Sequence, residues 1–186
     1  MRMGVLAIQG GFHAHLSMFG ELDCEVVEIR QTDELNDLDA LVLPGGESTV
    51  MARLLHKHNM WQAVADFAAH RPVMATCAGV ILLQQMGVLN IEVVRNAYGR
   101  QLESRIQPLS LPWTDEKIEV MFIRAPLIKA IHDPAISTLV SLNGYPVAIV
   151  KDQILAMTFH PELSQDKRLH QYFIDEIVKH ETRRQK

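Results

Sequence analysis

The sequence predicts an α/β fold, a single domain with a mostly parallel central sheet, helices on both faces and a small antiparallel element in the second half. Short β-branched runs alternate with helical apolar periods in the first half, an order typical of parallel sheets. In the second half, apolar runs follow one another across short turns. The chain has 186 residues, 48% of them hydrophobic, which is enough for one core.

Four strands are expected in the first half, a buried one at residues 5–8 and three more at 24–29, 40–43 and 73–75. The helix after the first strand has apolar residues at helical spacing, namely Phe12, Leu16 and Phe19. Pro44-Gly45-Gly46 stops the third strand, and Ser48 or Thr49 is expected to cap the helix that follows. The next helix ends before Pro72, and its inner face carries Trp61, Val64, Phe67 and Ala68.

In the second half, residues 118–123 are expected to form a strand. Residues 139–142 and 147–150 flank Asn143-Gly144, which predicts a hairpin, and a third run covers 154–159. A last helix is expected over 165–180, with an inner stripe of Leu169, Phe173 and Ile177. Since no repeat or linker interrupts the pattern, residues 1–186 are expected to be one domain.

Composition excludes several classes of protein. A net charge of −4 and a pI near 6.1 argue against nucleic-acid binding, and the basic residues Arg183, Arg184 and Lys186 indicate a solvated tail. No apolar run reaches the roughly 18 residues of a membrane span, and the N-terminal apolar run is too short for a signal peptide. We therefore expect a soluble, cytoplasmic protein whose two cysteines are reduced.

Cys77 lies in Ala75-Thr76-Cys77-Ala78-Gly79, between an expected strand and an apolar helix over 80–83. Small residues two positions away on each side are typical of a nucleophile on a sharp strand-to-helix turn. The helix start favours a thiolate, and the N–H of Ala78 points to where an oxyanion would form. The alternative is a buried cysteine that packs as a small hydrophobe, which is the interpretation for Cys24 within its strand.

His160-Pro161-Glu162 follows the strand at 154–159, at the edge of the sheet where catalytic groups of open α/β folds gather. His160 can serve as the base for Cys77, with Glu162 to orient it. A turn with a capped helix start remains the alternative. The pairs His13/His15 and His56/His58 point in different directions on a helix, so neither a metal nor a cofactor is expected.

At these motifs the sequence resembles a known family. "TCAG" followed much later by "HPE" is similar to the class I glutamine amidotransferases. Six motifs resemble the glutaminase subunits of pyridoxal 5′-phosphate synthases: "GVLAIQGGF", "LPGGEST", "TCAGVILL", "RNAYGRQ", "FIRAP" and "TFHPEL". The resemblance extends from Gly4 to the last helix.

The resemblance implies hydrolysis of L-glutamine to L-glutamate and ammonia, which passes to a separate synthase subunit that makes pyridoxal 5′-phosphate. Cys77 would form a glutamyl thioester, His160 would transfer protons, and Glu162 would orient His160. The Gly46 and Ala78 amides would form the oxyanion hole. The implied substrate contacts are Gly45, Gly46, Glu47, Arg95, Ile123 and Arg124. The implied partners are L-glutamine and the synthase subunit, with no nucleic acid and no membrane.

Two features depart from the family. Ala14 stands where a glutamate usually precedes the first-helix histidine, near the expected synthase contact, and the segment between Leu83 and Arg95 is short. Two other functions stay open: a different enzyme on the same scaffold, either the glutaminase of another biosynthetic complex or a γ-glutamyl hydrolase, or a non-enzymatic regulatory subunit. "FIRAP" and "RNAYGRQ" disfavour the first, and the intact Cys-His-Glu set disfavours the second.

Overall fold

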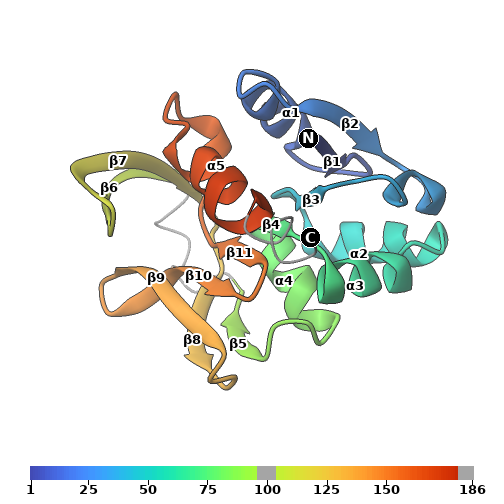
Figure 1. The fold of residues 1–186 in the computed structure, drawn as a ribbon. Coiled ribbons are helices and arrows are strands. Elements are labelled where there is room, and N and C mark those ends of the chain that lie inside the picture. The colour runs from blue at the N-terminus through green and yellow to red at the C-terminus, as the bar shows by residue number, and fades with distance from the viewer. Residues whose placement is uncertain (96–103, 180–186) are drawn as a thin grey trace.

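The computed structural model describes residues 1–95 and 104–179, which form an α/β structure around a seven-stranded sheet (Figure 1). The strand order is β2 (Glu25–Ile29), β1 (Arg2–Leu6), β3 (Ala40–Leu43), β4 (Val73–Thr76), β11 (Ile154–Met157), β10 (Tyr145–Lys151) and β9 (Ile136–Leu142). Pairing is parallel from β2 through β11 and antiparallel for the last two strands. The predicted mostly parallel sheet, with its hairpin across Asn143-Gly144, is confirmed.

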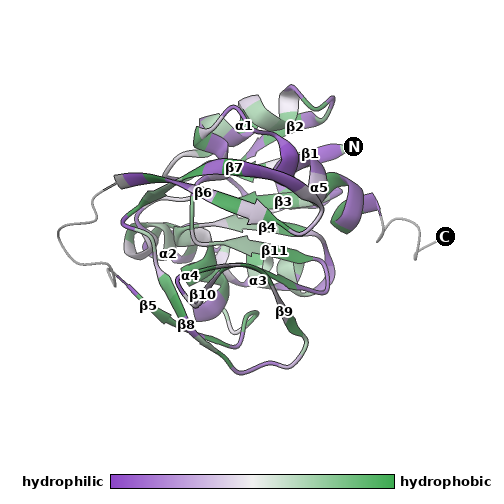
Figure 2. Cartoon of the chain, turned by 90° about the vertical axis from the view of Figure 1, so that its left-hand side faces the viewer, coloured by the Kyte–Doolittle hydropathy of each residue, from purple (hydrophilic) through white to green (hydrophobic). Residues whose placement is uncertain are grey.

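Helices cover both faces of the sheet, as predicted. On one face pack α2 (Ser48–Lys57), α3 (Trp61–His70) and α4 (Ala78–Gln85); on the other pack α1 (Phe12–Gly20), α5 (Arg168–Tyr172) and the π-helical η3 (Phe173–Val178). Within β3, Leu41 and Leu43 join the first core while Ala40 and Val42 join the second, because successive strand residues face opposite ways. Figure 2 shows these central strands as predominantly hydrophobic.

Several expected boundaries were wrong. The first strand, expected at 5–8, starts at Arg2, because β1 lies between β2 and β3 and pairs along its length with β2. The last strand of the sheet ends at Met157 rather than at residue 159. The last helix begins at Arg168 and becomes π-helical at Phe173, while its expected end at His180 lies outside the described residues, as does the basic tail.

The start of α2 also differs from the prediction. Neither Ser48 nor Thr49 caps the helix, because both lie within its first turn. Glu47 is the capping residue, with extended backbone angles and a carboxylate Oε2 that accepts a hydrogen bond at 2.8 Å from the Val50 N–H. The glutamate expected to bind substrate therefore has a structural role as well.

Within residues 1–95 and 104–179, four strands lie outside the central sheet. The antiparallel pair of β5 (Ile91–Val94) and β8 (Leu127–Ile131) was not predicted, and β5 occupies the short segment before Arg95. The strand expected at 118–123 exists, but it belongs to a longer ribbon of β6 (Ser104–Leu111) and β7 (Thr114–Ile123). Two 3₁₀ turns, η1 (Thr32–Leu35) and η2 (Pro161–Leu163), complete the described elements.

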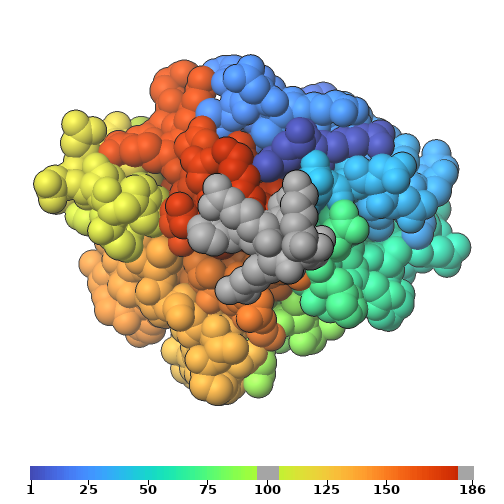
Figure 3. All heavy atoms as spheres, in the orientation of Figure 1, coloured from blue at the N-terminus to red at the C-terminus, as the bar shows by residue number. Residues whose placement is uncertain are grey.

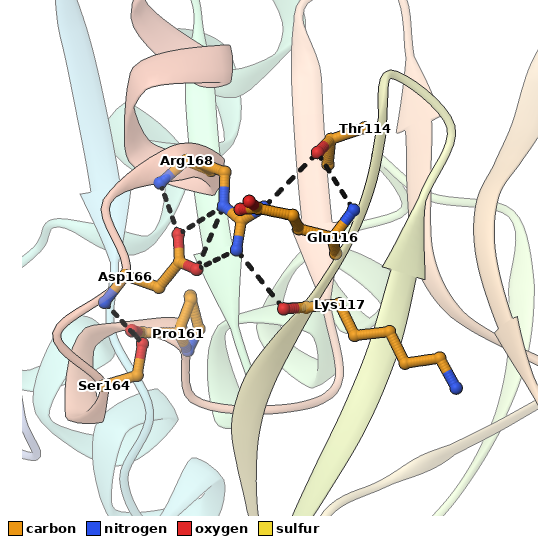
Figure 4. A network of polar contacts seen from close by, with 7 residues as sticks. All are labelled: Thr114, Glu116, Lys117, Pro161, Ser164, Asp166 and Arg168. Atoms are coloured by element: carbon orange, nitrogen blue, oxygen red, sulfur yellow. Dashed lines mark hydrogen bonds and ion pairs between the residues drawn. The ribbon is translucent and has the colours of Figure 1, made fainter.

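The β6–β7 ribbon packs its buried apolar side chains into the second core, and polar contacts add to this attachment. Near the start of β7, the Arg168 guanidinium binds Asp166 and donates to the main-chain carbonyl of Lys117 (Figure 4). Farther along β7, the carbonyl of Met121 accepts a hydrogen bond at 2.8 Å from the main-chain N–H of His160. The ribbon forms the yellow-green lobe at the left edge of Figure 3, and its attachment to His160 places the end of β7 beside the predicted site.

Candidate active site

Cys77 occupies the sharp turn between β4 and α4 that the sequence predicted. Its φ of +46° is a strained conformation for a residue with a side chain. The Cys77 N–H donates to the Met157 carbonyl at 2.8 Å, which fixes the turn to the neighbouring strand. A Cβ on Gly79 would lie 2.3 Å from the Leu43 carbonyl oxygen, so the helix can approach the sheet only with glycine there.

His160 and Glu162 follow β11, which lies parallel to β4 with Met157 opposite Thr76. Because the carboxyl ends of parallel strands share one edge, the His160 side chain reaches the same place as the Cys77 thiol. The Nδ1 of His160 lies 2.7 Å from Oε1 of Glu162, and both side chains are buried. The His160 ring also lies against Gly45, where a Cβ would be 2.2 Å from Cε1.

The electrostatics of this pair favour a charged imidazole. Burial alone would lower the pKa of His160, but hydrogen bonds and charges from Cys77 and Glu162 outweigh it and raise the pKa to about 10. Burial alone would likewise raise the pKa of Glu162, yet the facing imidazoles of His15 and His160 hold it below its ordinary value. His160 is therefore protonated and Glu162 ionised at neutral pH.

A cavity of about 420 Å³ opens at this edge of the sheet. The structure brings every residue expected at the site to its lining: Gly45, Gly46, Glu47, Cys77, Ala78, Arg95, Ile123, Arg124, His160 and Glu162. Ala78 is the first residue of α4, so its N–H belongs to the free amides at the helix start. The rest of "RNAYGRQ", after Arg95, lies outside the described residues.

The loop carrying Gly45 is shaped by the turn after β1. The Gly11 N–H donates to the Gly45 carbonyl at 2.9 Å. Gly10 has a φ of +96°, and a Cβ there would lie 2.0 Å from the same carbonyl oxygen. The Gln9 side chain accepts a hydrogen bond at 2.9 Å from the Glu47 N–H. These contacts fix one wall of the cavity.

The rim of the cavity carries an exposed charged pair. Nη2 of Arg95 lies 3.4 Å from Oε1 of Glu47 and donates to Oγ1 of Thr49 at 2.8 Å. The two charged side chains are 45% and 44% exposed. A ligand with one positive and one negative group can replace this contact with two of its own.

Sequence reasoning missed two groups of the site. Gln9 lines the cavity, and its signal was a polar residue directly after a buried strand. His15 was set aside with His13, yet His13 is exposed while His15 is fully buried, with Nε2 3.5 Å from Oε2 of Glu162. The helical spacing separated the two histidines correctly but gave no sign of what His15 faces.

Chemically, the cavity presents a thiol at a helix start, a charged imidazole and a carboxylate, the groups that acyl transfer through a thioester requires. Within residues 1–95 and 104–179, no cluster of three or more histidine, cysteine or acidic residues could hold a metal ion. No helix in this described part of the chain is long and apolar enough to cross a membrane.

Comparisons with known proteins point to one family. The profile of the SNO glutamine amidotransferase family matches residues 5–179. A protein of Kosmotoga olearia named pyridoxal 5′-phosphate synthase subunit PdxT is 41% identical, over 96% of this chain and 98% of its own. A protein of Shouchella clausii with the same name is 39% identical over 96% of each chain.

Solved structures agree with this assignment. A crystal structure titled glutamine amidotransferase superposes with a TM-score of 0.88 at 35% identity, covering 95% of this chain and 98% of that one. A putative GMP synthase protein from Thermoplasma acidophilum has a TM-score of 0.79 at 18% identity, covering 100% of this chain and 98% of that one. At that identity, the second comparison supports the fold alone.

Proposed function

The chain belongs to the SNO glutamine amidotransferase family, and we propose that Cys77, His160 and Glu162 carry out its hydrolysis of L-glutamine to L-glutamate and ammonia. The observation that supports this assignment is the cavity in which the three side chains meet, with His160 bound to Glu162 at 2.7 Å. Each comes from the end of a strand or the turn after it, so the parallel pairing of β4 and β11 holds them together.

The proposed chemistry starts when His160 takes the proton of the Cys77 thiol, which gives a thiolate beside an imidazolium. The sulfur attacks the side-chain amide carbon, and the developing oxyanion lies at the Gly46 and Ala78 amides. As the C–N bond breaks, the imidazolium gives its proton to the leaving nitrogen, which departs as ammonia. His160 then takes a proton from water, the hydroxide attacks the thioester, and glutamate leaves with the thiolate restored.

Glutamine has an α-carboxylate and an α-ammonium group, and the rim offers both complements. Arg95 and Arg124 supply positive charge for the carboxylate, and Glu47 supplies a carboxylate for the ammonium group. Ile123 contributes its backbone, since its carbonyl is 3.9 Å from the Cys77 sulfur. The side chain of the bound glutamine would then point inward, toward Cys77.

We further propose that the ammonia is used by a pyridoxal 5′-phosphate synthase subunit in a hetero-oligomer. The support is the name shared by the relatives that match nearly the whole chain. In this proposal residues 1–186 form one glutaminase domain that works in the cytoplasm. Ala14 lies half-buried on α1, and its effect on docking stays a prediction.

The direct test measures glutamate production from glutamine with and without the purified synthase subunit. The wild-type chain should be slow alone and faster in the complex, and Cys77→Ala should lose at least about 10⁴-fold in kcat. Cys24→Ala is the matched control, because Cys24 is the second free cysteine and lies outside the cavity. Equal loss in both variants would contradict the assignment of the nucleophile.

A thiol-directed glutamine analogue separates the remaining alternatives. It should label Cys77 and spare Cys24, whose pKa burial raises. Absence of labelling, even with the synthase present, would favour a non-enzymatic regulatory subunit. Activation by a different synthase would favour the glutaminase of another biosynthetic complex, and hydrolysis of γ-glutamyl peptides in place of glutamine would favour a γ-glutamyl hydrolase.

A further inference from the structure

Behind Cys77 and His160 lies a buried cluster of four polar side chains, of which the proposed reaction uses only Glu162. It consists of His15 from α1, Thr76 from the end of β4, Glu162 from η2 and His170 from α5. His15, Thr76 and His170 are 0% exposed and Glu162 is 5% exposed. Burying four polar side chains is unfavourable unless they satisfy one another, so their contacts indicate what the cluster does.

The contacts form a row of side chains that runs from His170 to His160, one of the proposed catalytic residues. Nε2 of His170 lies 3.3 Å from Nδ1 of His15, and Nε2 of His15 lies 3.2 Å from Oγ1 of Thr76. The same His15 nitrogen is 3.5 Å from Oε2 of Glu162, while Oε1 of Glu162 binds His160 at 2.7 Å. The two oxygens of the carboxylate thus face two different imidazoles.

Burial keeps both rear histidines neutral, so each carries a single ring proton. It lowers the pKa of His170 to about 3, and it lowers the pKa of His15 despite the nearby Glu162 carboxylate. One of the two facing nitrogens must donate to the other, which leaves two possible arrangements of the protons.

One arrangement of the two ring protons is favoured both at His170 and at Glu162. If His15 donated from Nδ1, the proton of His170 would be at its own Nδ1, which is buried without a hydrogen-bond partner. The bare Nε2 of His15 would then face the Glu162 carboxylate, lone pair against lone pair. If His170 donates instead, the His15 proton is at Nε2 and points at Thr76 and the carboxylate. The second arrangement leaves an unpaired acceptor on His170. It also directs a donor toward Oε2 of Glu162, a buried oxygen that has no other hydrogen-bond partner and lies 3.5 Å from Nε2 of His15.

We propose that His15, held in one tautomer by His170, is a positioning residue that donates an N–H to the Glu162 oxygen that His160 does not use. With donors on both oxygens, the carboxylate cannot turn away from His160, and Oε1 stays on Nδ1. This is how outer partners orient ligating carboxylates and imidazoles at other sites. The inference rests on the proposed function, since it adds a residue to the same site.

The first test is independent of activity. Nitrogen-15 NMR of the full-length chain at neutral pH should show both His15 and His170 neutral and protonated at Nε2, with slowly exchanging ring protons. Protonation of His15 at Nδ1 would overturn the proposal, whether or not the chain hydrolyses glutamine. Failure of the proposed function would instead appear as inactivity of the wild-type complex.

The second test compares three variants in the complex with the synthase subunit. His15→Leu fills the space without a donor and should lower kcat about 10- to 100-fold, with a smaller change in KM. His15→Gln places an amide N–H near the position of Nε2 and should recover most of that loss. His58→Leu, a change at an exposed histidine that follows α2 and lies outside the cavity, should match the wild type. Wild-type kcat in a folded His15→Leu, or no recovery by a folded His15→Gln, would overturn the proposal.

A pH profile distinguishes positioning from general loosening. The titratable groups that face the Glu162 carboxylate are His15 from α1 and His160 after β11, with His170 from α5 behind His15. Without the His15 N–H the carboxylate is less stabilised, so the acid limb of kcat/KM should move to higher pH in His15→Leu and return in His15→Gln. An unmoved limb together with reduced kcat would assign His15 a purely structural role.

Discussion

Two carboxylates line the same cavity, each beside a cation, and they work in opposite surroundings. The Glu162 side chain is 1% exposed, and its Oε1 lies 2.7 Å from Nδ1 of His160. The Glu47 side chain is 44% exposed, and its Oε1 lies 3.4 Å from Nη2 of Arg95. Charges attract strongly where water is excluded, and exposed pairs contribute only about 0–1 kcal/mol. The inner pair is therefore suited to fix a reacting group, and the rim pair is suited to exchange partners with a ligand.

The causes of their pKa shifts sharpen this contrast. The pKa of Glu162 stays below its usual value, against the effect of burial, because His15 and His160 face it. The pKa of Glu47 is lowered mainly by the Val50 N–H at the start of α2, and Arg95 contributes less. Changing the pair of Glu162 and His160 should thus lower the rate of the reaction. Changing the pair of Glu47 and Arg95 should lower the affinity for glutamine.

The largest expected effect comes from Glu162→Gln. An amide offers His160 a choice of oxygen or N–H, so the imidazole loses both its tautomer and its counter-charge. We expect kcat for glutamine hydrolysis to fall about 10³- to 10⁴-fold. Glu47→Gln, measured beside it at saturating glutamine, should lower kcat by less than about tenfold. Equal losses in kcat would break the comparison between inner and rim carboxylates.

The buried cluster behind the site should also make the stability of the protein decline in acid, through His170. The pKa of His170 is about 3 in the folded chain and 6.5 when unfolded, so this residue has no effect above pH 6.5. Below pH 6.5 the unfolded chain binds a proton that the folded chain refuses. Stability is then lost as pH falls, by on the order of 3 kcal/mol at pH 4.

Urea unfolding as a function of pH measures this loss. His170→Gln, which cannot titrate, should flatten the decline between pH 6.5 and pH 4, even if its stability at pH 7 is lower. His13→Gln is the control, because His13 is exposed on α1 and its removal should leave the slope as in the wild type. If the unfolding free energy of the wild type and of His170→Gln fell equally steeply with pH, His170 would not be held neutral in the folded chain.

The four strands that the first half contributes to the central sheet were predictable, apart from the start of β1, because most of their residues are apolar and a local turn signal follows them. Residues 40–43 were predicted as a strand, and β3 has those bounds. Ribbon β6–β7 was predicted only in part, since Pro108 and the polar residues of β6 obscure its apolar pattern. Its place in the molecule depends on distant contacts such as Arg168 with Lys117, which local sequence does not encode.

The site divides in the same way. Cys77 and His160 carry local signatures, a turn between small residues and a histidine followed by proline, so sequence alone could nominate them. His15 has no such signature, because its contacts are with Thr76, 61 positions away, and His170, 155 positions away. What the sequence does not encode locally is the environment behind the proposed catalytic residues, and that environment is where the two carboxylates differ.

A smaller effect is expected where the backbone approaches the inner pair. In Gly45→Ala the new Cβ would lie 2.2 Å from Cε1 of His160, so the ring must shift. A displacement of about 1 Å in a catalytic group lowers rate about 100-fold, and we expect that loss in kcat. Gly20→Ala is the control, since its Cβ would meet Val26 at an ordinary 3.7 Å. A wild-type kcat in Gly45→Ala would show that the reaction tolerates a displaced His160 ring.

The smallest effect is expected at the rim. Arg95→Gln removes the positive charge but leaves the inner groups in place, so KM for glutamine should rise about tenfold while kcat changes less than about threefold. The melting temperature should stay close to that of the wild type, because an exposed pair adds little stability. Salt gives a further check on this assignment.

Screening should raise the wild-type KM for glutamine as ionic strength increases, and it should affect the KM of Arg95→Gln less. Arg53→Gln, an exposed change on α2, serves as the control for net charge. A loss confined to kcat in Arg95→Gln would place this residue with the inner groups, because only interactions that strengthen in the transition state act on kcat alone.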